Sequence, residues 1–116
     1  MQNTEILSLQ PSELAGWLAE NFYIQLPMDI QGEDDIKNAV KITLKLASFE
    51  AYLSQLLTEA EIMTRDKKRH SAKSEWEDMV DKKNSISHMC DIVKHQRDAL
   101  SRSFTFYKYL NDLERL

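Results

Sequence analysis

The chain has 116 residues, enough for one ordinary domain, and its 42% apolar share is too high for a disordered tail. Its net charge is −4, and its single cysteine, Cys90, excludes a disulfide-held fold and a zinc site built from several thiolates. It lacks a glycine-rich phosphate loop, a nucleophile elbow and a metalloprotease helix motif. The sequence therefore favours a non-enzymatic protein that works through its surfaces, with no cofactor and no metal.

The first expected element is a short helix that begins at Pro11, a residue favoured in the first helical turn. Apolar residues recur at helical spacing from there to Phe22. From Tyr23 to Gly32 apolar and polar residues alternate, which is the period of extended chain, but Pro27 and the lack of a second strand argue against a sheet. We expect residues 1–32 to form a short helix and an extended connector whose apolar residues lie against helices.

The rest of the chain predicts two long helices, because all glycines and prolines lie at or before residue 32. The second helix is expected over 33–64, after an acidic start, and the third over 75–114. Both show apolar residues at alternating steps of four and three, the pattern of a coiled-coil seam. In the second helix these are Ile42, Leu46, Phe49, Leu53, Leu56, Ala60 and Met63. In the third they include Trp76, Met79, Ile86, Cys90, Val93, Leu100, Phe104 and Tyr107.

A polar segment, 65–74, separates the two helices and is expected to be the turn of an antiparallel hairpin. Ser74 and Glu77 match a capping box at the start of the third helix. The segment is strongly basic, and its cations are the candidate nucleic-acid contacts, because lysine and arginine on a solvated turn neutralise phosphates without reading sequence. They are Arg65, Lys67, Lys68, Arg69 and Lys73. The alternative is that they only complement a helix C-terminus and keep the turn solvated.

Each long helix carries a second apolar stripe that a hairpin partner cannot cover. In the second helix the stripe is Ile36, Val40, Leu44, Ala47 and Ala51; near the chain end it includes Ala99, Phe106, Leu110 and Leu113. These stripes need the N-terminal helix or another subunit. We expect a homo-oligomer, with Phe106, Leu110 and Leu113 as the candidate interface.

Two polar groups in the third helix have alternative interpretations. His88, Asp91 and His95 share one face at a spacing that can bind a metal, but the second helix offers no histidine, so an exposed Asp91–His95 pair is favoured. Lys83 and Arg97 fall at seam positions. They either fix the register and the oligomeric state, or they lie at the edge of the seam with their aliphatic carbons packed and their charged groups in solvent.

Three short segments resemble a known family. They are Phe22-Tyr23-Ile24, KSEW at 73–76 and ALSRSFTFYKYL at 99–110. Together with the element order, they resemble the UvsY-type recombination-mediator proteins of T4-like phages and small helical relatives in other phages. The best-matching positions are Lys73, Ser74, Glu75, Ala99, Leu100, Arg102, Phe104 and Lys108. The resemblance implies a ring-like helical homo-oligomer that binds single-stranded DNA non-specifically and helps load a recombinase where single-strand-binding protein sits.

The expected fold is thus all-α: a short N-terminal helix, an extended connector and a long, self-associating, coiled-coil-like hairpin in one domain. The leading hypothesis is a phage-type recombination or replication accessory that binds single-stranded DNA and meets a recombinase or single-strand-binding protein. The alternative is a phage-encoded adaptor or inhibitor without nucleic-acid binding, which presents Glu33, Asp34 and Asp35 to a basic partner. Charge supports both, because residues 1–63 hold 3 basic and 10 acidic side chains and residues 64–116 hold 12 and 9. Uncharged runs such as 21–28 are too short to span a membrane, and we expect a soluble protein in the cytoplasm, that of a bacterial host if phage-encoded.

Overall fold

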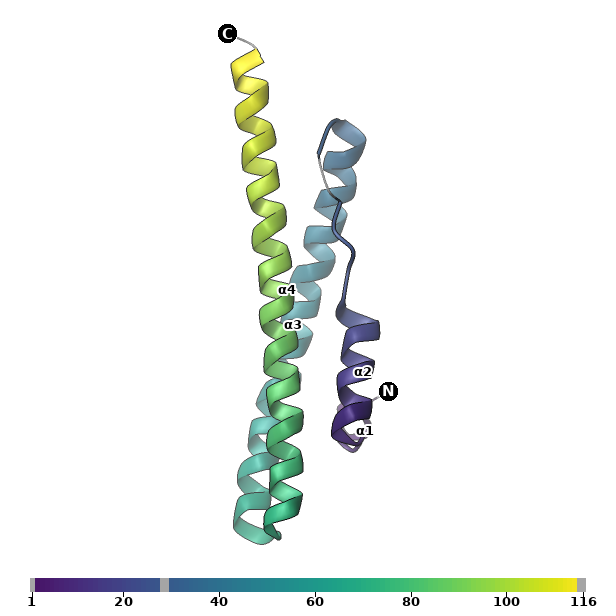
Figure 1. The fold of residues 1–116 in the computed structure, drawn as a ribbon, viewed down its shortest axis with the longest axis vertical. Coiled ribbons are helices and arrows are strands. Elements are labelled where there is room, and N and C mark those ends of the chain that lie inside the picture. Colours follow the sequence, from purple (N-terminus) through teal and green to yellow (C-terminus); the bar gives the residue numbers. More distant parts are fainter. Residues whose placement is uncertain (1, 28–29, 115–116) are drawn as a thin grey trace.

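The computed structural model describes residues 2–27 and 30–114, and over these residues the protein is helical with no strand (Figure 1). The described residues form four helices: α1 (Asn3–Leu7), α2 (Pro11–Phe22), α3 (Glu33–His70) and α4 (Lys73–Glu114). The described chain is a rod of 67 × 21 × 18 Å. The all-α prediction is confirmed.

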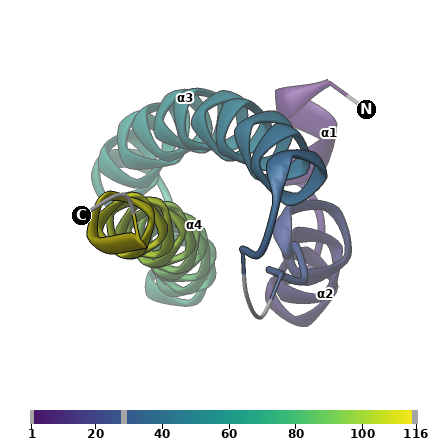
Figure 2. The same cartoon turned by 90° about the horizontal axis from the view of Figure 1, so that it is seen from above.

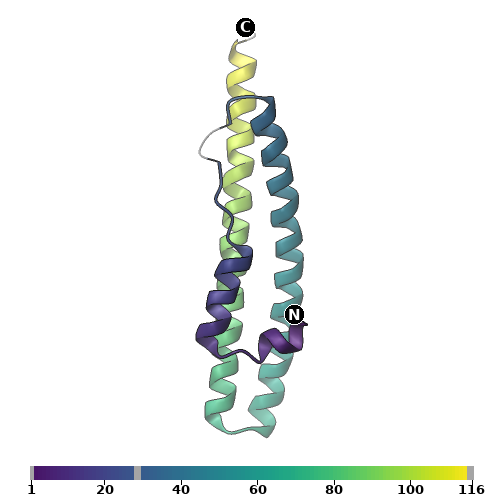
Figure 3. The same cartoon turned by 90° about the vertical axis from the view of Figure 1, so that its right-hand side faces the viewer.

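Helices α3 and α4 run antiparallel along most of the rod and form the predicted hairpin (Figures 1 and 3). Their contact is the apolar seam, which we define as the buried residues of the 4–3 pattern. On α3 these are Leu46, Leu53, Leu56 and Ala60, and on α4 they are Met79, Ile86, Cys90, Val93 and Leu100. Burial raises the pKa of the Cys90 thiol, which therefore stays protonated and acts as a small apolar residue in this seam.

The turn of the hairpin is shorter than the expected segment 65–74. Helix α3 does not end at residue 64 but continues to His70, and only Ser71 and Ala72 separate it from α4. Lysine and arginine are good helix formers, so the loss of large apolar residues after Met63 ends the apolar stripe without ending the helix.

The predicted capping box is wrong, because α4 begins one residue before Ser74. The Ala72 carbonyl accepts the first amide bonds of α4, from Glu75 and Trp76. Glu77 pairs instead with the ammonium of Lys73, one helical turn earlier, at 3.7 Å. Both side chains of this pair are exposed, so it adds little to stability.

The N-terminal segment lies along one side of the hairpin and runs from its middle toward the end of the rod where α3 begins (Figure 3). Helix α2 starts at Pro11 as predicted, whereas the short helix α1 was not expected. The ring of Phe22 is buried beside α3, in edge contact with Phe49 at 5.0 Å and stacked on Tyr52 at 5.6 Å between ring centroids. These ring contacts anchor the segment to the hairpin.

Three long-range hydrogen bonds also hold the N-terminal segment. The Tyr52 hydroxyl donates to Asn3 Oδ1 at 2.8 Å, and the Lys82 ammonium donates to the Leu7 carbonyl at 2.8 Å. The Gln96 amide donates to the Ile24 carbonyl at 2.6 Å, which fixes the connector against α4. The described parts of the connector, 23–27 and 30–32, are therefore extended and lie against helices, as the alternating pattern predicted.

We expect Leu53→Ala or Ile86→Ala to lower the free energy of unfolding by about 2–5 kcal/mol, because each removes a fully buried seam side chain and leaves a cavity. Denaturant titration followed by circular dichroism measures this change. The matched control is Ile62→Ala on α3. Ile62 is 50% exposed, so this substitution should lower the free energy of unfolding by less than about 1 kcal/mol. Equal losses at Ile62 and Ile86 would contradict the seam.

Candidate functional site

The candidate phosphate contacts lie together at the end of the rod that holds the turn. Arg65, Lys67, Lys68, Arg69 and His70 occupy the last turns of α3, and Lys73 opens α4. We call these six residues the basic end. All are exposed except Lys67, which is half-buried. This end extends past α1 and α2, so only the two hairpin helices form it (Figures 1 and 3).

The cations of the basic end are only partly neutralised. Lys68 lies over the Trp76 ring, 5.2 Å from its centroid, and Lys73 has its ion pair with Glu77. Within the described part of the chain, no ion pair engages Arg65, Lys67 or Arg69. The C-terminus of α3 favours cations, which accounts for part of the cluster but leaves these charges available to an anionic ligand.

Five side chains line a polar pocket of about 240 Å³ between the two helices at this end. Glu61, Thr64, Arg65 and Lys68 come from α3, and Lys83 comes from α4. The Thr64 hydroxyl is buried and donates to the Ala60 carbonyl at 2.7 Å, so its proton is already used. Sequence reasoning missed this pocket, because it depends on the register that brings Lys83 beside Arg65.

The two seam cations differ in their surroundings. The Arg97 guanidinium donates to Glu50 Oε2 at 2.6 Å, an ion pair that joins α4 to α3. The Glu50 side chain is only 13% exposed, so its carboxylate depends on this partner. Lys83 is half-buried, and no described carboxylate forms an ion pair with it.

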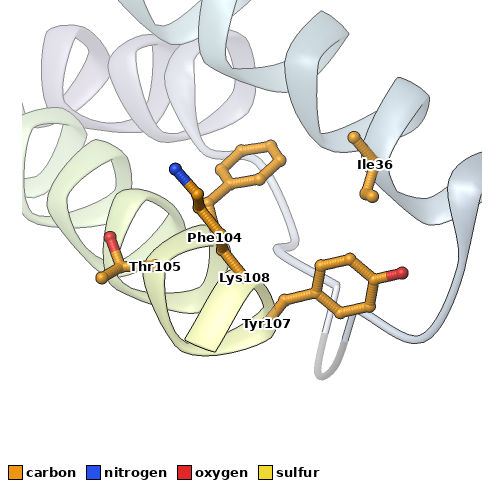
Figure 4. A pocket seen from close by; sticks show the side chains of 5 residues that line it. All are labelled: Ile36, Phe104, Thr105, Tyr107 and Lys108. Atoms are coloured by element: carbon orange, nitrogen blue, oxygen red, sulfur yellow. The ribbon is translucent and has the colours of Figure 1, made fainter. Parts of the chain in front are cut away.

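The other end of the rod, which we call the open end, has an apolar pocket. Seen along the rod, α3 curves away from α4 toward the side on which α1 and α2 lie (Figure 2). The pocket there measures about 350 Å³ and is lined by Ile36, Phe104, Thr105, Tyr107 and Lys108. Phe104 and Tyr107 project from α4 toward the side of α3 that carries Ile36 (Figure 4).

Part of the second apolar stripe is exposed near this pocket. On α3, Val40 is 46% exposed and Leu44 is 67% exposed, and Ala47 and Ala51 continue the stripe. We call these four residues the α3 apolar row; the N-terminal segment packs on another face of α3 and leaves the row uncovered. Of the candidate interface on α4, Leu113 is exposed, while the side chains of Phe106 and Leu110 lie outside the described residues.

The acidic residues at the start of α3 lie at the open end. Glu33 and Asp34 are exposed, and Asp35 Oδ2 accepts a hydrogen bond from the backbone N–H of Gln31 at 3.0 Å. The N-cap residue, Gly32, has no side chain that could cap the helix. The three carboxylates of the first turn instead stabilise the N-terminus of α3 by complementing the helix dipole.

Two further features concern the described ranges, 2–27 and 30–114: the candidate metal ligands of α4 and the hydropathy of the helices. His88, Asp91 and His95 are exposed on α4, and no described group of three histidine, cysteine or acidic residues is placed to hold a metal ion. No helix within these ranges is both long and apolar enough to cross a membrane.

Comparison with known proteins gives no relative: no protein-family model, no curated protein and no solved structure matches the chain. The resemblance to the UvsY type therefore stays an expectation.

We expect Arg97→Met to lower the free energy of unfolding by about 1–3 kcal/mol, because it leaves the Glu50 carboxylate without its partner. Denaturant titration measures the loss. Lys94→Met, an exposed position on the same helix, is the control and should change stability by less than about 0.5 kcal/mol. The double variant Glu50→Leu/Arg97→Met should recover part of the loss; a cycle with no coupling would contradict the ion pair.

Proposed function

We propose that this protein is a non-enzymatic accessory of DNA recombination or replication that binds the backbone of single-stranded DNA through its basic end. The observation that carries the proposal is the clustering of six basic side chains at an end that α1 and α2 do not cover. Single strands, assistance to a recombinase and contact with single-strand-binding protein follow from the family resemblance.

The chemistry of the basic end favours phosphate contact over base recognition. Exposed lysine and arginine neutralise phosphates and release counterions, whatever the sequence. The aromatic ring at this end, Trp76, is half-buried beneath Lys68 and offers no free face on that side for a base. We therefore propose non-specific binding.

The charge distribution limits DNA to one end of each molecule. Residues 1–63 carry 10 acidic side chains against 3 basic ones, and they build α1, α2 and most of α3. Repulsion from this acidic body opposes binding along the length of the rod. One basic end binds few phosphates, so effective binding requires several copies to act together.

If the basic end binds DNA, changing Lys67, Lys68 and Arg69 to Glu together should abolish binding of a fluorescent single-stranded oligonucleotide at low salt. In the unchanged protein, the logarithm of affinity should fall with the logarithm of salt by about 0.7 per phosphate contacted. Fluorescence anisotropy across a salt series measures both quantities, and oligonucleotides of different sequence should lose affinity equally.

The matched control changes three exposed cations elsewhere on α4, Lys94, Arg102 and Lys108, to Glu. It alters net charge by the same amount and should reduce affinity only modestly. Loss of binding in the control with retention in the triple variant at 67–69 would place the DNA contact on α4, away from the basic end.

We also propose that a second copy of the chain covers the α3 apolar row. Val40 and Leu44 are large apolar side chains on the solvent side of α3, and soluble monomers rarely leave such stripes open. Charge favours an antiparallel copy. The exposed acids Glu33 and Asp34 precede the exposed bases Lys41 and Lys45, so two antiparallel α3 helices bring opposite charges together.

We expect Leu44→Asp to lower the mass of the assembly without unfolding the hairpin, because Leu44 is 67% exposed and its row packs on no other part of the described chain. Light scattering at micromolar concentration gives the mass, and circular dichroism gives the helix content. Asn38→Asp adds the same charge at an exposed position off the row and should leave the mass unchanged. A mass of 13.6 kDa for the unchanged chain at all concentrations would overturn self-association.

The open end supports a second candidate function, an adaptor or inhibitor that binds a protein. Its apolar pocket lies at the same end as the exposed carboxylates of Glu33 and Asp34, a combination that suits a partner with apolar and basic side chains. This candidate requires no DNA binding at low salt, together with a protein interaction that is lost when Asp34 and Asp35 become lysine.

A further inference from the structure

Lys83 occupies a position of α4 at which the seam pattern calls for an apolar residue. Its neighbours in the pattern, Met79 and Ile86, are both buried in the seam. The Lys83 side chain is half-buried and lines the polar pocket with two further cations, Arg65 and Lys68. Three like charges around one partly enclosed space repel one another, and Lys83, which is half-buried, has also lost some of its hydration.

The pocket does not neutralise these charges itself. Among the described residues that line it, the one carboxylate is that of Glu61, and no ion pair joins Glu61 to any of the three cations. By contrast Arg97, the other seam cation, has Glu50 at 2.6 Å. An anion in the pocket would give Lys83 a negatively charged partner, as Glu50 is for Arg97.

The geometry also fits an anion. Glu61, Thr64, Arg65 and Lys68 recur at the three- and four-residue steps that place side chains on one face of α3, and Lys83 faces them from α4. The volume of about 240 Å³ has room for a tetrahedral oxyanion. Arginine can donate two parallel hydrogen bonds to such a group, and the two lysines add point charges from both helices.

We propose that the pocket of Arg65, Lys68 and Lys83 binds one phosphate group and thereby links α3 to α4 near the turn. The inference rests on the proposed function in one respect: the expected phosphate belongs to the backbone of single-stranded DNA. The bound phosphate replaces the repulsion among the three cations with attraction. Glu61 opposes the anion and lowers its affinity.

The test uses the full chain and two probes, a fluorescent single-stranded oligonucleotide and inorganic phosphate. Lys83→Met should weaken oligonucleotide binding about tenfold and reduce the salt slope by about 0.7, the loss of one phosphate contact. Glu61→Gln should have the opposite effect and strengthen binding, because it removes the negative charge from the pocket. Inorganic phosphate should raise the thermal midpoint of the unchanged chain and of Glu61→Gln, but not that of Lys83→Met.

Two controls separate this role from folding. Lys83→Arg keeps the charge and should retain most of the affinity, whereas Lys94→Met removes an exposed charge of the same helix and should leave both the affinity and the phosphate response nearly unchanged. Without phosphate, Lys83→Met should unfold at the same denaturant concentration as the unchanged chain or a higher one, because methionine suits a seam position.

The outcomes distinguish the pocket from the proposed function. If the oligonucleotide binds equally to Lys83→Met, Glu61→Gln and the unchanged chain, the pocket proposal is overturned and DNA binding through the rest of the basic end stands. If the oligonucleotide does not bind but phosphate stabilises the chain through Lys83, the pocket is supported with a free anion as its ligand, and the proposed function fails. If neither probe responds, both fail.

Discussion

The apolar seam between α3 and α4 is the interaction on which the other parts of the molecule depend. Its buried residues continue from Leu46 to Ala60 on α3 and from Met79 to Leu100 on α4, without a glycine or proline to interrupt either helix. A seam of this length fixes the register of two helices over most of the rod. That register decides which side chains meet at each end, and it places Phe49 and Tyr52 where Phe22 can pack on them.

The two ends of the rod receive different chemistry from the same two helices. At the turn, residues 65–70 at the C-terminus of α3 are mostly basic, and none of them is a large apolar residue. At the open end, α3 curves away from α4, and Phe104 and Tyr107 line the apolar pocket there. The acidic residues at the start of α3 lie at the same end. The N-terminal segment covers one side of the hairpin and leaves the α3 apolar row on another. The molecule therefore offers a polar end, an apolar end and an exposed row between them.

Sequence reasoning found the features that depend on local pattern. The 4–3 spacing located the seam, Pro11 located α2, and the alternation after Phe22 located the connector. It missed features that depend on small differences in free energy between helical and non-helical chain. Helix α1 is only five residues long. Helix α3 continues through 65–70 because lysine and arginine are good helix formers, so a solvated basic segment can be either helix or turn. The polar pocket was missed for another reason: residues 65 and 83 become neighbours only after the turn has fixed the register.

The positions of the turn and of the N-terminal segment also determine the order in which contacts can form. Contacts near Ser71 join residues close in sequence, so the loop that must close is short and the hairpin can grow outward from the turn. The bonds of the N-terminal segment span 49 to 75 residues, from Asn3 to Tyr52 and from Leu7 to Lys82. They reach their partners only after those partners share one surface. We expect the basic end to form early in folding and the Phe22 contacts to complete it.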